Sequence, residues 1–250
     1  MKYLIFLLFL TYDGMAKPLK FVTEALPPYQ VVNKRGQLVA GTSYALIKNL
    51  LDNIQVEAKI ELMPWARAYR TALTDKNTFI FSIARSAQRE PLFHWIAPLR
   101  QLRFHFYGLQ KPDDGIHLAK KPLLELRVVA VRGSIEEDLL RQIGFTIERN
   151  LLLTDNYLSA WRMLLLGRVD AIYANEYVKN GVNKQLGFKE SPFYIHYSMN
   201  QVLELYVAAN LNTDPELISL ITRQFEKMKN NGQMKEIIAE QERLVYNTKK

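Results

Sequence analysis

Short apolar strands and amphipathic helices alternate through the first third of the chain, and this order restricts the fold more than any other feature of the sequence. Helical spacing runs from an N-cap at Thr42 or Ser43, and again from Trp65 to Leu73. Strands are predicted before, between and after these helices, at 20–23, 56–62 and 78–83. The order strand, helix, strand, helix, strand predicts a wound α/β sheet.

The second half of the chain repeats this pattern. A polar break at 111–115 separates the two halves, and we interpret it as a crossing between two parts of the molecule. Strands are predicted at 104–109, 127–131, 169–173, 192–194 and 203–209, and helices at 135–143, 156–166, 216–229 and 233–241. The 250 residues suffice for one large domain or two small ones.

Two arginines follow the buried strand 78–83. Ser82 lies near the strand end, and Arg85 and Arg89 lie in the polar turn that comes next. A hydroxyl and a guanidinium delivered to one point suit a small anion, because the planar guanidinium matches a carboxylate with two parallel hydrogen bonds. The alternative is that both arginines are solvated loop charges, which usually do nothing specific.

A second anion site is predicted where strand 127–131 meets the next helix. Arg132, Gly133 and Ser134 lead into that helix. Free backbone N–H groups and the positive end of the helix dipole favour an anion there. The motif alone is weak evidence for an anion site, because many helices begin at Ser. The positive charge of Arg132 strengthens this prediction.

The first sixteen residues have the order of a secretory signal peptide. Lys2 precedes an apolar run from Tyr3 to Leu10, and small residues lead to Ala16. The run is too short to span a bilayer, which needs about 20 apolar residues. A buried first strand is the other alternative. We expect cleavage after Ala16 and a periplasmic location.

Composition argues against several classes of function. The chain has no cysteine, so a lipid-modified N-terminal cysteine, disulfides and thiolate metal sites are excluded. The net charge of +8 is scattered, without the basic and aromatic clusters typical of nucleic-acid binding. The four histidines lack metal-ligand spacing, and no nucleophile elbow or phosphate loop occurs. These observations favour a binding protein without cofactor or metal over an enzyme.

The segment ARSAQREPLFHW resembles the A-R-T-P-E-R-E-x-x-F-x-W signature of bacterial periplasmic solute-binding proteins of the amino-acid-binding type, the family 3-like substrate-binding domains of ABC transporters. The resemblance covers nearly the whole chain after the first twenty residues. Residues 86–88 depart from the signature. The matching residues are Ala84, Arg85, Arg89, Glu90, Phe93 and Trp95.

The resemblance implies an α/β, two-lobed periplasmic binding protein fold of type II. Each lobe would be a mixed sheet flanked by helices, with two crossing strands, 104–109 and 203–209, as the hinge. A monomer of this kind closes over a small ligand that carries a carboxylate and delivers it to a membrane transporter permease. The implied division is a signal peptide at 1–16, lobe 1 at 17–108 plus 206–250, and lobe 2 at 109–205.

The resemblance also implies which residues bind the ligand. Arg89 corresponds to the residue that grips the ligand carboxylate in relatives. The other implied contacts are Glu24, Tyr29, Trp65, Ser82, Ala84, Arg132, Gly133, Ser134 and Asn175.

Two departures from the family pattern concern the ligand amine. Relatives that bind α-amino acids usually carry Asp at the place of Asn175. An uncharged Asn cannot neutralise an ammonium, and the neighbouring Glu176 is the alternative carboxylate. Tyr44 replaces an acidic residue of the first long helix. The sequence is therefore compatible with two kinds of ligand, an acid with an amine and an acid without one. A sensing subunit for a membrane receptor, or a dehydratase-like enzyme with Glu24 as its acid, are the alternative functions.

Overall fold

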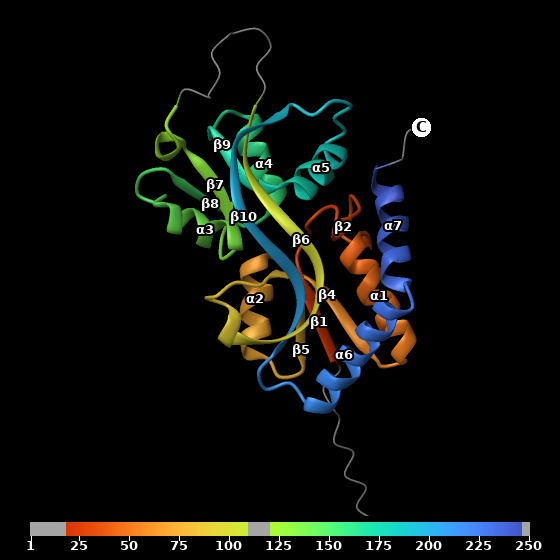
Figure 1. The fold of residues 1–250 in the computed structure, drawn as a ribbon. Helices are drawn as coiled ribbons and strands as arrows, with labels where there is room; N and C mark the ends of the chain where they lie inside the picture. Colours follow the sequence, from red (N-terminus) through yellow and green to blue (C-terminus); the bar gives the residue numbers. More distant parts are fainter. Residues whose placement is uncertain (1–18, 110–120, 247–250) are drawn as a thin grey trace, which may run out of the picture.

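The computed structural model describes residues 19–109 and 121–246, which form an eight-stranded mixed sheet flanked by helices (Figure 1). The strand order is β4-β1-β5-β10-β6-β9-β7-β8. Three parallel strands lie at each end of this sheet, and two long antiparallel strands lie between them. The predicted α/β class is confirmed.

Each set of parallel strands, with its helices, makes one lobe, and the two lobes lie at opposite ends of the long strands (Figure 1). Lobe 1 contains β1 (Leu19–Thr23), β2 (Val31–Val32), β3 (Leu38–Ala40), α1 (Thr42–Ile54), β4 (Ala58–Leu62), α2 (Trp65–Thr74), β5 (Thr78–Ala84), α6 (Pro215–Asn230) and α7 (Gln233–Tyr246). Lobe 2 contains β7 (Val128–Val131), α3 (Ile135–Ile143), β8 (Leu151–Thr154), α4 (Tyr157–Leu165), β9 (Ala171–Asn175) and α5 (Glu176–Gln185). Short 3-10 turns at Glu90–Leu92 and Leu123–Glu125 complete the described elements.

The two long strands are β6 (Phe93–Leu109) and β10 (Phe193–Asn210), paired from Phe93 with Asn210 to Leu109 with Phe193. The sequence predicted strands only at 104–109, 192–194 and 203–209, so the predicted strands were too short. Between the lobes many of their side chains are exposed or half-buried, so the apolar pattern that marks a strand is interrupted there. Since both strands run through both lobes, the predicted division at 108/109 and 205/206 stays a prediction.

Several local predictions need correction. The sequence did not predict β8 or α5, and α7 continues beyond the expected end at 241. Neither Thr42 nor Ser43 caps α1, because Gly41 occupies the N-cap position. A Cβ at Gly41 would lie 2.3 Å from the Tyr29 carbonyl oxygen, so the close approach of two backbone segments requires glycine there. Asp214 caps α6, since its side chain accepts from the Glu216 N–H.

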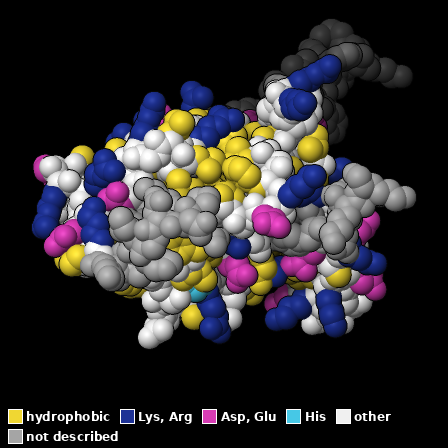
Figure 2. Space-filling model, turned by 90° about the horizontal axis from the view of Figure 1, so that it is seen from above, with side chains coloured by type: hydrophobic (Ala, Val, Ile, Leu, Met, Phe, Trp, Pro, Cys, Tyr) yellow, Lys and Arg dark blue, Asp and Glu magenta, His cyan; other side chains and the backbone are white. Residues whose placement is uncertain are grey.

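Apolar side chains of both lobes form the core, and it includes the fully buried Trp161. Charged side chains of both signs are spread over the face of lobe 2 seen from above (Figure 2).

The predicted signal peptide at 1–16 and the break at 111–115 lie outside the described residues. Within the described part of the chain, no helix has the length and apolar content needed to cross a membrane.

Asp170 fastens the start of β9 to the chain segment before β7. It accepts hydrogen bonds from the Arg127 N–H at 2.8 Å, the Arg127 guanidinium at 3.1 Å and the Lys121 ammonium at 2.9 Å. Burial alone would raise the pKa of Asp170, but the hydrogen bonds from Arg127 and Lys121 outweigh it and lower this pKa to about 2.

We expect Asp170→Asn to reduce the free energy of unfolding at pH 7 by about 1 kcal/mol, because solvent screens part of the interaction. A lowered pKa stabilises the fold above the unfolded value of about 4 and loses this contribution as the pH falls towards 2. Urea unfolding of both proteins at pH 7 and pH 3 should show the difference shrinking at the lower pH. A difference that stays constant would contradict this account.

Candidate functional site

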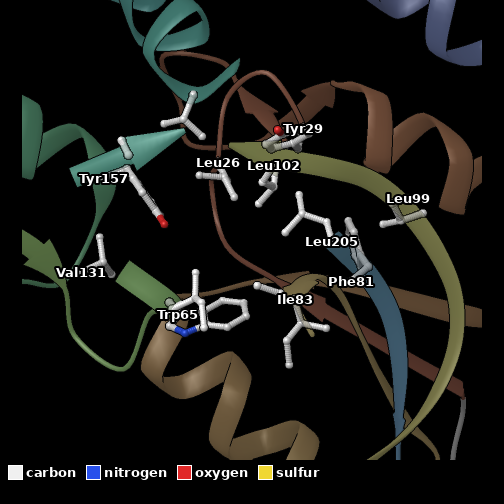
Figure 3. Packing of buried hydrophobic residues seen from close by; sticks show 14 of the residues in the cluster. Leu26, Tyr29, Trp65, Phe81, Ile83, Leu99, Leu102, Val131, Tyr157 and Leu205 are labelled. Carbon is white, nitrogen blue, oxygen red and sulfur yellow. The ribbon is translucent and has the colours of Figure 1, made fainter. Parts of the chain in front are cut away.

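A pocket lies between the two lobes, with an empty volume of about 300 Å³ including its open mouth. Lobe 1 and the long strands supply Glu24, Leu26, Trp65, Ser82, Ala84, Arg89, Leu102 and Leu205, and lobe 2 supplies Ser134, Ile135, Glu136, Tyr157 and Asn175. Most of these residues lie at or just beyond the carboxyl ends of the parallel strands, where open α/β sheets place ligand groups. In Figure 3, the Tyr157 hydroxyl points from lobe 2 into the space bordered by Trp65, Leu26 and Leu205.

Ser82 reaches the pocket through an irregularity in β5. Ile83 pairs with Tyr206 and Phe81 with Val207, so Ser82 is an extra residue in the ladder, and its φ is 60°. Such a bulge redirects a side chain out of the regular alternation. The Ser82 hydroxyl oxygen accepts a hydrogen bond from the side-chain amide of buried Gln30. The pocket therefore contains a hydroxyl whose position is fixed by backbone geometry.

The two arginines of the turn after β5 lie in opposite environments. Arg85 is partly exposed and pairs with Glu90 at 2.6 Å. The Arg89 side chain is 4 % exposed, and its guanidinium carbon lies over the rings of Trp65 and Tyr69, 5.9 and 5.1 Å from their centroids. Only Arg89 lines the pocket.

The Arg89 guanidinium joins the lobes. Its Nη2 donates to Asp138 Oδ2 at 2.9 Å and to the Gly133 carbonyl oxygen at 3.1 Å, both in lobe 2. The same carbonyl accepts from Trp65 Nε1 at 2.7 Å. Nη1 of Arg89 is buried and has no hydrogen-bond partner among the described residues. One side of the guanidinium therefore holds lobe 2, and the other side is left with an unused donor.

The predicted anion cradle at the start of α3 contains the chain's own carboxylate. The Gly133 N–H donates to Glu137 Oε2 at 2.7 Å, and Ser134 Oγ caps the helix by accepting from the Glu137 N–H. Arg132 is exposed and directed towards Asp155, 3.9 Å away, outside the pocket. Of the three predicted residues, Ser134 lines the pocket and Gly133 contributes its carbonyl to the contact between the lobes.

Asn175 and Tyr29 connect the lobes on the other side of the pocket. Asn175 Oδ1 accepts from the Val178 N–H at 3.1 Å, which caps α5, and from the Tyr29 hydroxyl at 3.3 Å. Tyr29 is buried but does not line the pocket, whereas Asn175 does. Glu176, the other carboxylate considered for an amine, is exposed and lies outside the pocket.

The sequence reasoning missed two polar residues of the pocket, Glu136 and Tyr157. Glu136 is 3 % exposed and Glu24 is 4 % exposed, and the two come from opposite lobes. Burial, and then the charge of Glu136, raise the pKa of Glu24 well above its usual range. Burial also raises the pKa of Glu136, against the hydrogen bonds that it receives from Tyr157 and Ser134. Acidic residues are common in the first turn of a helix, so Glu136 carried no signal until its burial was visible.

Comparison with known proteins gives one family and many solved structures. The family model of bacterial extracellular solute-binding proteins, family 3, matches residues 19–240. No curated protein matches the chain. Among solved structures, an ancestral arginine-binding protein bound to arginine is 21% identical with a TM-score of 0.76, and the match covers 90% of this chain and 98% of that one.

Two further structures are similar to this chain. A histidine kinase sensor domain with similarity to periplasmic binding proteins is 16% identical with a TM-score of 0.76, over 90% of this chain and 95% of the other. An amino acid ABC transporter substrate-binding protein from Streptococcus pneumoniae, bound to L-arginine, is 18% identical with a TM-score of 0.73, over 90% and 93%. These likenesses show the type II periplasmic binding protein fold.

Proposed function

The chain belongs to the bacterial extracellular solute-binding proteins of family 3, and from this premise we propose that it captures a small ligand with a carboxylate between its two lobes and delivers it to a membrane transporter. It would do so as a periplasmic monomer, without a cofactor and without catalysis. The predicted signal peptide supports this location.

The observation that carries the proposal is the state of Arg89. Arg89 lines the pocket between the lobes, and its Nη1 is a buried, charged donor that has no hydrogen-bond partner among the described residues. A buried unsatisfied donor is costly, and a charged one more so. A ligand carboxylate would satisfy it, and the Ser82 hydroxyl lies in the same pocket to support the ligand. Because Nη2 already contacts Asp138, we expect the carboxylate to use the Nη1 side of the guanidinium.

The partner that receives the ligand is the less supported half of the proposal. A substrate-binding protein of an ABC transporter and a histidine kinase sensor domain both share this fold. Presentation of the ligand to a membrane receptor is therefore the second candidate function. Measuring uptake of the ligand by cells with and without this protein would separate the two functions. Loss of a transport protein should reduce uptake, whereas loss of a sensor should leave it unchanged.

A thermal-shift screen tests the binding function directly. We expect one or more members of a panel of amino acids, dicarboxylates and small peptides to raise the melting temperature. A ligand at 100 times its dissociation constant stabilises the folded state by about 2.7 kcal/mol. If saturating concentrations of the whole panel leave the melting temperature unchanged, the proposal is wrong.

A further inference from the structure

One face of α5 carries contacts from lobe 2 to lobe 1. Tyr177, Gly181 and Lys184 are spaced by four and three residues, so they lie on the same face of the helix. Gly181 faces the backbone of 27–28. Further along the helix, the Lys184 ammonium donates to the Leu244 carbonyl oxygen of α7 at 2.8 Å. The helix therefore contacts lobe 1 at two places, a loop after β1 and the end of the C-terminal helix.

The end of α7 is fixed to lobe 1 and also touches lobe 2. The helix packs against α1 and α6, and Ile237 is buried in the core. Gln241 Oε1 accepts from the Gly41 N–H at 3.1 Å, just before α1. In Figure 1, α7 runs beside α1 and its last turns reach the level of α5, which they contact. The last turns are therefore placed where lobe 2 meets lobe 1.

Arg100 adds the hinge to this contact. It lies in the part of β6 that pairs only with β10, between the stretch where β10 also pairs with β5 and the stretch where β6 also pairs with β9. Its guanidinium carbon is 3.8 Å from the centre of the Tyr177 ring, and its Nη1 donates to Glu242 Oε1 at 2.5 Å. A cation over an aromatic ring is attracted to it, more strongly where water is partly excluded. The Arg100 side chain is 21% exposed, so one guanidinium joins the hinge to both lobes in a partly shielded place.

We infer that these contacts form a clasp that holds the two lobes together independently of any ligand. Its members are Arg100, Tyr177, Lys184, Glu242 and the Leu244 carbonyl. Of the described residues that line the pocket, none belongs to the clasp. Asn175, which does line the pocket, is the N-cap of α5, so the pocket wall and the clasp move together. A rotation that separates lobe 2 from lobe 1 must therefore pull α5 away from α7 and break the clasp.

The clasp would act on ligand affinity from outside the pocket. A ligand that binds only the closed form has an apparent affinity that is reduced by the fraction of molecules that are closed. Weakening the clasp lowers this fraction equally for every ligand. Clasp variants should therefore weaken binding of all ligands by one common factor, whereas a change to a pocket residue alters the ratio between ligands.

The test measures the separation of the lobes in the purified full chain without a ligand. The chain has no cysteine, so two introduced cysteines can carry spin labels at defined places. Arg70→Cys in α2 and Gln142→Cys in α3 are exposed and lie on opposite lobes. The starts of these two helices meet where Trp65 Nε1 donates to the Gly133 carbonyl, so the labels should move apart when the lobes open. Double electron–electron resonance then gives the ratio of closed to open molecules.

With the clasp intact, we expect a population at the short distance. Tyr177→Leu removes the ring under Arg100, and Glu242→Gln removes one charge while keeping the shape of a partly exposed side chain. Each should lower the ratio of closed to open molecules about fivefold. This factor corresponds to about 1 kcal/mol, the size of one cation–π contact or one ion pair.

Glu240→Gln is the matched control, because this glutamate is exposed two positions before Glu242 on the same helix. It should give the same distances as the intact clasp. Equal ratios in the clasp variants and the control would overturn the inference. A single long distance in the chain with the intact clasp would overturn it as well, because the clasp would then not hold the lobes. Since no ligand enters the measurement, failure of the whole ligand panel would remove the proposed function and leave this result unaffected.

Discussion

Replacing Arg89 by alanine should weaken ligand binding by roughly 30-fold to several thousand-fold, because losing one partner of a buried charge pair costs about 2–5 kcal/mol. The Arg89 side chain is almost fully buried and lines the pocket, and its Nη1 has no hydrogen-bond partner within the described part of the chain. Arg89→Lys should lose much of the affinity as well, because an ammonium cannot contact Asp138, the Gly133 carbonyl and a ligand in the same fixed plane.

Calorimetry with a ligand from the screen checks this prediction. Arg85→Ala is the matched control: that arginine lies four positions earlier, is partly exposed and pairs with Glu90 outside the pocket. It should leave affinity within about twofold, since exposed ion pairs contribute little. Asp138→Asn separates the two roles of Arg89, because it removes the ion pair between lobes and keeps the guanidinium. Unchanged affinity in Arg89→Ala would show that Arg89 does not bind a ligand carboxylate.

Local signals in the sequence predicted much of the fold. Parallel strands such as β5 are apolar because both of their faces are covered. The long strands β6 and β10 were only partly predicted, because many of their side chains between the lobes are exposed or half-buried and interrupt the apolar pattern of a strand. Their strand conformation comes from pairing with each other, which is a contact distant in sequence.

The candidate site shows the same limit. The turn after β5 predicted an anion site, but only packing against α2 and lobe 2 distinguishes the buried Arg89 from the partly exposed Arg85. Similarly, the start of α3 was read as a cradle for a ligand anion, whereas Glu137 already occupies the Gly133 N–H. Glu136 could not be distinguished from an ordinary first-turn glutamate until its burial opposite Glu24 was seen.

Gly181 should control how closely the lobes approach. It lies in α5 of lobe 2, and a Cβ there would be 2.5 Å from the carbonyl carbon of Pro27 and 2.6 Å from the nitrogen of Pro28, both in lobe 1. These are backbone atoms, so a side chain can be accommodated only if the helix and the loop move apart. The nearby hydrogen bond between Tyr29 and Asn175 would lengthen with them.

We expect Gly181→Ala to lower ligand affinity by about 1–3 kcal/mol, or roughly 5- to 150-fold, through overpacking at this contact. Alanine favours a helix over glycine by up to about 1 kcal/mol, so α5 itself should not be weakened. A loss of affinity without a loss of folding stability would therefore locate the effect between the lobes. Small-angle scattering of the ligand-bound proteins should give a larger radius for the variant, while Gln185→Ala, at an exposed position of the same helix, should match the unmodified chain. Equal radii and equal affinities in all three proteins would show that ligand binding does not require this close approach.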